Sequence, residues 1–100
     1  MLNARTAQDD AFREFGQSLK RFLSAKGEYR TTYAESRGLC PEALDHVLNG
    51  RFVTEPGLGL RPPMSREDME GLVKDLCGDH GAKGALMRLL DKISPPGDMN

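Results

Sequence analysis

The sequence predicts an all-α protein of five helices in one domain, and three observations lead to this prediction. Apolar residues recur at spacings of three and four in several segments, which is the period of an amphipathic helix. Glycine and proline stand between these segments. No two neighbouring runs show the alternation expected of a half-buried strand pair. Because 100 residues suit a single hydrophobic core, residues 1–100 are expected to form one domain with an ordered core at about 7–93.

The first helix is expected at about 7–26. Its apolar residues share one face: Phe12, Phe15, Leu19, Phe22 and Leu23. Carboxylates stand near its start and cations near its end, which suits the helix dipole. Gly27 is expected to end it.

Two short helices are expected next. Residues 29–37 (YRTTYAESR) form the first of them, ended by Gly38. The second begins at Pro41, since the first helical position tolerates proline, and it ends at Gly50. Its inward residues are Leu44, Val47 and Leu48.

Residues 51–64 (RFVTEPGLGLRPPM) read as a connecting loop without a strand pair, because three prolines and two glycines interrupt any period. Three roles stay open for this loop: a flexible connection, an arm that places Arg61 in the minor groove of DNA, and a dimer contact.

The last two helices have clear signals. Ser65 and Asp68 stand at the spacing of an N-terminal cap, ahead of an apolar face formed by Met69, Leu72, Val73, Leu76 and Cys77. Residues 78–81 (GDHG) read as the turn that ends this helix. The final helix is expected at 82–93, with Leu86, Leu89, Leu90 and Ile93 inward, and residues 94–100 are expected to fray.

The segment 29–50 carries the most specific pattern. Two brief helices joined by a tight turn form a helix-turn-helix, and Gly38 can adopt the positive φ that such a turn needs. Ala34 precedes Gly38 by four residues, where a small side chain lets two helices approach closely.

This stretch resembles the Cro/CI-type, or lambda-repressor-like, helix-turn-helix family without a gap from Glu28 to Gly50. The resemblance rests on Ala34, Glu35, Gly38, Leu39, Pro41, Leu44, Val47, Asn49 and Gly50. The two last helices are similar to that family's fourth and fifth. The chain departs from the family at Arg37, where an apolar residue is usual, at Glu28, where Leu is frequent, and in its longer loop 51–64. We expect Tyr29 or Tyr33 to supply the missing core contact.

The resemblance implies a compact five-helix bundle whose helix from Pro41 enters the major groove of DNA. It places nine residues at that interface: Arg30, Thr31, Cys40, Glu42, Ala43, Asp45, His46, Asn49 and Arg51. Arg30 would meet a phosphate or a guanine edge, Glu42 or Asp45 a cytosine amino group, and Ala43 a thymine methyl. Asn49 and Arg51 would hold the DNA backbone.

The expected reading helix carries Glu42, Asp45 and His46 but no Lys or Arg. Carboxylates near a helix start also stabilise the helix dipole, so a base-contacting role and a purely structural role both stay open. Any DNA-binding surface must therefore gain its positive charge from outside this helix. Four residues are candidates: Arg30, Arg37, Arg51 and Arg61.

The composition, the net charge and the absence of certain motifs exclude several other classes of protein. The formal net charge is −1, two cysteines are too few for a disulfide scaffold, and no apolar run approaches the roughly 18 residues of a membrane span. No secretory signal is evident, so a cytosolic location is expected. The Cys and His residues, Cys40, His46, Cys77 and His80, do not have the spacing of a zinc finger, and Cys77 reads as a buried thiol. No nucleotide-binding or hydrolase motif is present, so neither a cofactor nor an enzymatic activity is expected.

We therefore expect a small bacterial or phage repressor that reads an inverted repeat in double-stranded DNA as a homodimer. Met87, Leu90 and Ile93 are expected to form the two-fold contact. The alternative is the same fold used as a protein-interaction module, such as a phage-encoded inhibitor or adaptor. The near-neutral charge and the acidic helix favour this alternative.

Overall fold

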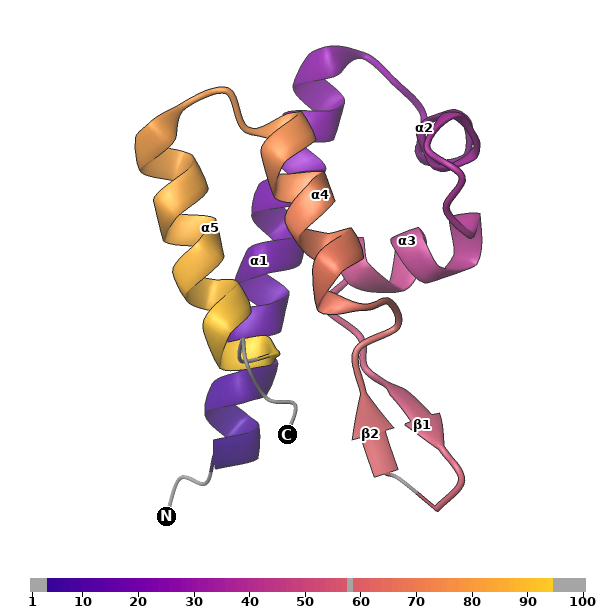
Figure 1. The fold of residues 1–100 in the computed structure, drawn as a ribbon, viewed down its shortest axis with the longest axis vertical. Helices are drawn as coiled ribbons and strands as arrows, with labels where there is room; N and C mark the ends of the chain where they lie inside the picture. The colour runs from indigo at the N-terminus through magenta and orange to yellow at the C-terminus, as the bar shows by residue number, and fades with distance from the viewer. Residues whose placement is uncertain (1–3, 58, 95–100) are drawn as a thin grey trace.

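Three helices stand side by side, and two short helices and a hairpin lie on one flank of them (Figure 1). The computed structural model describes residues 4–57 and 59–94. In chain order the elements are α1 (Ala4–Lys26), α2 (Arg30–Ser36), α3 (Pro41–Leu48), β1 (Val53–Glu55), β2 (Gly59–Arg61), α4 (Arg66–Leu76) and α5 (His80–Ile93). The described residues are mostly helical, which confirms the prediction of an all-α fold.

The core lies between α1, α4 and α5 and continues beneath α2 and α3. Its fully buried side chains include Phe12, Phe15, Leu19, Leu44, Val47, Leu48, Met69, Val73 and Leu90. The predicted inward faces are therefore confirmed, except that Phe22 and Leu89 are only partly buried. Leu90 and Ile93 are 0% and 2% exposed. Because the core of one chain already covers Leu90 and Ile93, these two cannot form the expected dimer contact, whereas Met87, the third residue of that expectation, is only partly buried and its role stays a prediction.

Two glycines bring α3 against α1. A Cβ atom on Gly16 would stand 2.4 Å from the carbonyl oxygen of Val47, and one on Gly50 would stand 2.6 Å from Cα of Arg13. Gly50 also has a φ of 65°, which only glycine adopts readily. Any side chain at either position would therefore push α3 away from α1.

The last two helices are capped by the side chains before them. Ser65 Oγ accepts a hydrogen bond from the backbone N–H of Asp68 at 3.1 Å, as predicted. Asp79 Oδ2 accepts one from the N–H of Ala82 at 2.9 Å, so Asp79 begins α5. The segment 78–81 was expected only to end the preceding helix. It instead starts the next one, two residues earlier than predicted.

The chain after α3 contains the strand pair that the sequence did not predict. Strands β1 and β2 are antiparallel, with Val53 opposite Arg61. Each strand has three residues, which is too short to display the alternation that identifies a strand in a sequence. The hairpin projects from the helical body (Figure 1).

Three further expectations concern the ends of the chain and membranes. Helix α1 begins at Ala4, three residues before the predicted start. The expected fraying of 94–100 falls, from residue 95 on, outside the described residues. None of the described helices is both long enough and apolar enough to cross a bilayer.

Candidate nucleic-acid interface

Helices α2 and α3 form a helix-turn-helix unit. Gly38 in the turn has a φ of 70°. The backbone N–H of Leu39 donates to the carbonyl oxygen of Ala34 at 2.8 Å, which closes the end of α2. Ala34 is fully buried where the two helices meet. The tight turn expected from Ala34 and Gly38 is present.

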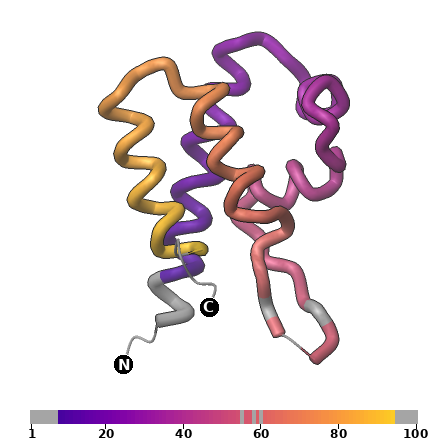
Figure 2. Tube along the Cα trace, in the orientation of Figure 1, coloured from indigo at the N-terminus to yellow at the C-terminus, as the bar shows by residue number. Residues whose placement is uncertain are grey.

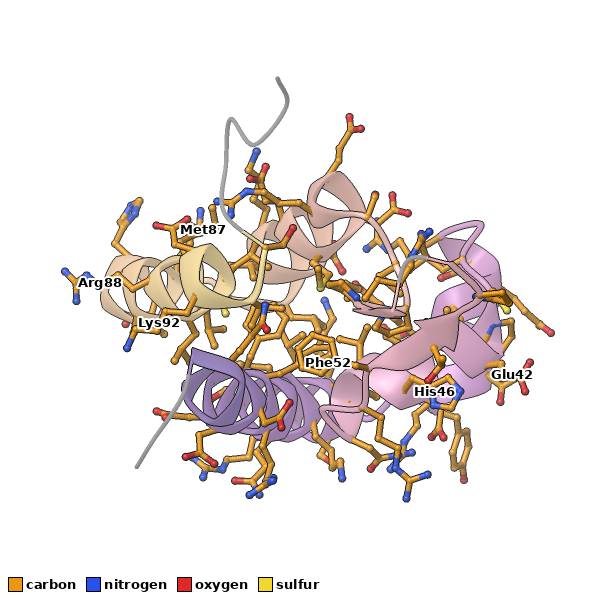
Figure 3. All side chains as sticks on the ribbon, turned by 90° about the horizontal axis from the view of Figure 1, so that it is seen from below. Glu42, His46, Phe52, Met87, Arg88 and Lys92 are labelled. Atoms are coloured by element: carbon orange, nitrogen blue, oxygen red, sulfur yellow. The ribbon has the colours of Figure 1, made fainter. Side chains whose placement is uncertain are left out.

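Helix α3 has one buried and one accessible face. Leu44, Val47 and Leu48 are fully buried. Glu42 is exposed, and Asp45, His46 and Asn49 are partly exposed. Figure 3 shows Glu42 and His46 at the opposite side of the molecule from Arg88 and Lys92 of α5. A partner could therefore reach α3 without contacting α5.

Four polar side chains link this face to α1 and α2. The Arg30 guanidinium donates through Nη1 to Oδ1 of Asp45. Asn49 donates through Nδ2 to Oδ2 of Asp45 at 3.4 Å, and its Oδ1 accepts from Nζ of Lys20 at 3.2 Å. The network thus joins residues from three helices, and Asp45 is not an uncompensated charge on α3.

The exposure of the Arg30–Asp45 pair decides what it contributes. Their side chains are 41% and 47% exposed, so water screens the attraction and the pair adds little stability. The ion pair instead fixes where the Arg30 guanidinium lies. A guanidinium has five N–H groups, so most of those of Arg30 remain able to donate to another acceptor. Asp45 therefore holds Arg30 beside the accessible face of α3.

Four more of the expected interface residues surround a shallow depression between α3 and the hairpin. Its volume is about 330 Å³, and it is lined by Cys40, Glu42, Ala43, His46, Val53 and Pro63. Nδ1 of His46 is buried and has no hydrogen-bond partner among the described residues. Glu42 forms no ion pair within the described part of the chain, so it is the one acidic group of this face left uncompensated there.

The remaining expected residues lie at the two ends of this face. Thr31 is exposed on α2. Arg51 follows α3, where its backbone N–H donates to the carbonyl oxygen of His46 at 2.9 Å while its side chain is exposed. All nine expected residues are thus at least partly accessible, and most of them gather around α3.

The hairpin continues this surface and has a fixed base. Phe52 precedes β1 and packs on Phe12 of α1, with ring centroids 4.7 Å apart. Met64 follows β2 and is 8% exposed. Because both ends of the hairpin are anchored in the core, the exposed Arg61 of β2 has a defined place opposite Val53, which lines the depression beside α3. Of the three roles considered for residues 51–64, a purely flexible connection fits this anchoring least.

Arg37, the fourth candidate cation, serves a different contact. It forms an ion pair with Asp75 of α4, and its guanidinium lies 5.4 Å from the ring centroid of Tyr33. The Tyr33 hydroxyl donates to the other oxygen of Asp75 at 2.6 Å. Tyr33 is 1% exposed whereas Tyr29 is 81% exposed, so Tyr33 supplies the missing core contact.

Burial, followed by the hydrogen bond to the Asp75 carboxylate, raises the pKa of the Tyr33 phenol above its usual value. Burial also raises the pKa of the Cys77 thiol, which is 2% exposed. Cys77 is therefore the buried thiol that the sequence indicated. Among the described residues, no three Cys, His, Asp or Glu side chains gather as a metal site.

Comparison with known proteins adds no identification. No family model, curated protein or solved structure matches this chain. Its function must therefore be inferred from the geometry of the site.

Two features of the site were not predicted from the sequence. The Arg30–Asp45 contact joins residues that are fifteen positions apart in the sequence, and no local sequence pattern predicts such a contact. The depression beside His46 depends on the hairpin, which was read as a loop. A Val-Thr pair before Pro-Gly, at 53–57, was the only local signal for that hairpin.

Proposed function

We propose that this chain is a DNA-binding transcriptional regulator that reads double-stranded DNA through α3. The observation that carries the proposal is the position of α3: its apolar side is buried, its other side is accessible, and a tight glycine turn joins it to α2. This is the arrangement in which a helix can enter the major groove while its partner helix crosses the backbone. In this role the chain acts by occupying DNA, with no catalytic step.

The charges around α3 support the proposal. Arg30 offsets the charge of Asp45 and keeps further N–H groups available. Arg51 is exposed just after α3, and Arg61 is exposed on β2 opposite Val53, which lines the depression beside α3. These three arginines would contact phosphates, and Glu42, Ala43 and His46 would meet base edges. Arg37 is not included, because Asp75 holds it against α4.

One observation favours a second function, a protein-interaction module. Glu42 has no ion-pair partner within the described residues and projects from the most accessible part of α3. A carboxylate in this position suits a basic protein surface better than a phosphate backbone.

Fluorescence anisotropy distinguishes the two functions. The full chain is titrated against the DNA upstream of its own gene, and against a scrambled duplex of equal length, at low and physiological salt. A regulator binds the first duplex more tightly, and its affinity falls with salt. Absence of binding at low salt would overturn the proposal and favour the protein-interaction module.

Three variants test the assigned residues. Arg51→Ala should weaken binding to both duplexes by roughly tenfold, because a phosphate contact carries no sequence information. Arg30→Ala should weaken it further, since it also exposes the charge of Asp45. Glu42→Ala should change the preference between duplexes. Arg88→Ala, on the far side of the molecule, is the matched control (Figure 3). Equal affinities for all three variants and the unaltered chain would refute the assignment.

A further inference from the structure

The largest described hollow lies on another face, along the seam between α1 and α5. These helices run antiparallel and side by side (Figure 2). The groove between them has a volume of about 480 Å³ and is lined by Glu14, Ser18, Arg21, Phe22, Ala25, Ala82, Ala85, Leu86 and Leu89. It shares no residue with the face of α3.

Most of the residues that line the groove are apolar. Phe22 and Leu89 are large apolar residues that the fold leaves only partly buried, and Leu86 of the same lining is 3% exposed. Helix α5 contributes only Ala and Leu to the lining. Small side chains, such as Ala25 and Ala85, leave room for the backbone of another helix to approach.

The charges of the groove are arranged in a self-complementary way. Its charged residues are Glu14 and Arg21, both on α1. They are seven residues apart, which places them about 10 Å apart along the helix. Neither forms an ion pair or side-chain hydrogen bond within the described residues. Ser18, with its small side chain, stands near the midpoint between them.

A second copy of this chain would satisfy both charges. A two-fold axis near Ser18 sets α1 of one copy antiparallel to α1 of the other, so that each Glu14 meets the opposite Arg21. The same rotation brings the partly buried Phe22 and Leu89 of both copies toward one seam. A stable interface needs about 600 Å² from each copy, which is about a tenth of the 6298 Å² that the chain exposes.

We propose that the groove between α1 and α5 is the surface through which two copies of this chain associate, paired by Glu14 and Arg21 across a two-fold axis. This inference does not depend on DNA binding. It replaces the expected dimer contact through Met87, Leu90 and Ile93, and it leaves α3 accessible in both copies.

Sedimentation equilibrium of the full chain, without DNA, tests the proposal by charge reversal. Glu14→Arg alone sets two arginines against each other at each contact, and Arg21→Glu sets two carboxylates against each other. Each single change should raise the dimer dissociation constant by at least about tenfold. Glu14→Arg combined with Arg21→Glu in one chain reverses both charges and should restore the constant to within about threefold.

A mixture of the two single variants provides a second readout. One chain then carries only arginine at positions 14 and 21 and the other only glutamate, so the mixture should form heterodimers while each variant alone is monomeric. Circular dichroism of each variant checks that the fold is kept. Glu35→Arg, on the exposed side of α2, is the matched control and should leave the constant unchanged.

Three outcomes would overturn the proposal. The unaltered chain could remain monomeric up to high micromolar concentration, as expected if the groove receives a helix of another protein. The single variants could dimerise as well as the unaltered chain, which would place the interface elsewhere. If neither the double variant nor the mixture regained the ability to form dimers, the pairing of Glu14 with Arg21 would be excluded. A chain that dimerises as proposed without binding DNA would separate this inference from the proposed function.

Discussion

Asp75 joins α2 to α4 through two different donors. Its Oδ2 accepts from the buried hydroxyl of Tyr33, and its Oδ1 pairs with the half-exposed guanidinium of Arg37. A hydrogen bond to a carboxylate is stronger than one between neutral groups. Removal of the hydroxyl would leave the carboxylate, whose side chain is 23% exposed, with Arg37 as its remaining described partner.

Tyr33→Phe should lower the free energy of unfolding at pH 7 by about 1–2 kcal/mol, because the ring is kept while the hydrogen bond to Asp75 is lost. The difference should depend on pH in one direction. The pKa of Tyr33 is raised in the folded chain, so its contribution is complete below the unfolded pKa of 10.0 and is lost as the pH rises toward the folded pKa. Urea denaturation at neutral and alkaline pH measures this.

Tyr29→Phe is the control for this prediction. Tyr29 is 81% exposed, so removing its hydroxyl should leave the stability unchanged at every pH. A difference between Tyr33→Phe and the unaltered chain that stays constant above pH 10 would show that ionisation of Tyr33 is not linked to folding.

At the scale of elements, the position of α3 depends on a close contact between its C-terminal end and α1. In a helix interior, changing glycine to alanine usually stabilises a protein by roughly 0.5–1 kcal/mol. At Gly16 the new methyl group would stand 2.4 Å and 2.7 Å from the carbonyl oxygens of Val47 and Leu48. These are backbone atoms at the end of α3 and cannot turn aside.

Gly16→Ala should therefore destabilise the chain by about 2–3 kcal/mol, as overpacking does. Gly71→Ala is the matched control, since Gly71 lies inside α4 and a Cβ there would meet nothing within 4 Å. It should stabilise the chain by about 0.5–1 kcal/mol. Urea denaturation measures both changes, and a neutral or stabilising effect of Gly16→Ala would contradict the close approach of α3 to α1.

The same elements explain how far the sequence could predict the fold. The helices were found because Phe12, Phe15 and Leu19, or Met69, Leu72 and Val73, repeat at the helical period, and burial of such a face is the main force that orders it. Residues Val53–Glu55 form a strand too short to have a readable period. Tyr29 and Tyr33 are the two aromatic residues of a polar segment, so the sequence could name the core residue there only as one of these two.

The site was predictable to a smaller extent than the fold. The accessible side of α3 follows from the helical period, which separates Glu42, Asp45 and His46 from Leu44 and Val47. The pairing of Arg30 with Asp45 depends on the angle at which α2 meets α3, which no local pattern encodes. The groove between α1 and α5 depends likewise on how two distant helices pack.

At the scale of the whole molecule, positive and negative charges nearly balance. DNA binding must therefore depend on where the cationic side chains lie on the surface. The formal net charge is −1, so there is no overall attraction to DNA. Arg88 and Lys92 lie on the opposite side from α3 (Figure 3) and would remain in solvent when α3 is bound. The arginines that the proposed function assigns to phosphates are Arg30, Arg51 and Arg61, each of which is at least partly exposed.

This distribution sets the salt dependence of DNA binding under the proposed function. Each phosphate contact contributes about −0.9 to the slope of log K against log salt, so three contacts give about −2.7. Affinity should then fall roughly 40-fold when the salt concentration rises fourfold. Arg51→Ala should reduce the slope to about −1.8, whereas Arg88→Ala should leave it unchanged. A series of anisotropy titrations at increasing salt measures the slope. A slope near zero would mean that the phosphate backbone is not contacted, and an equal change for Arg51→Ala and Arg88→Ala would mean that the face of α3 is not where the DNA lies.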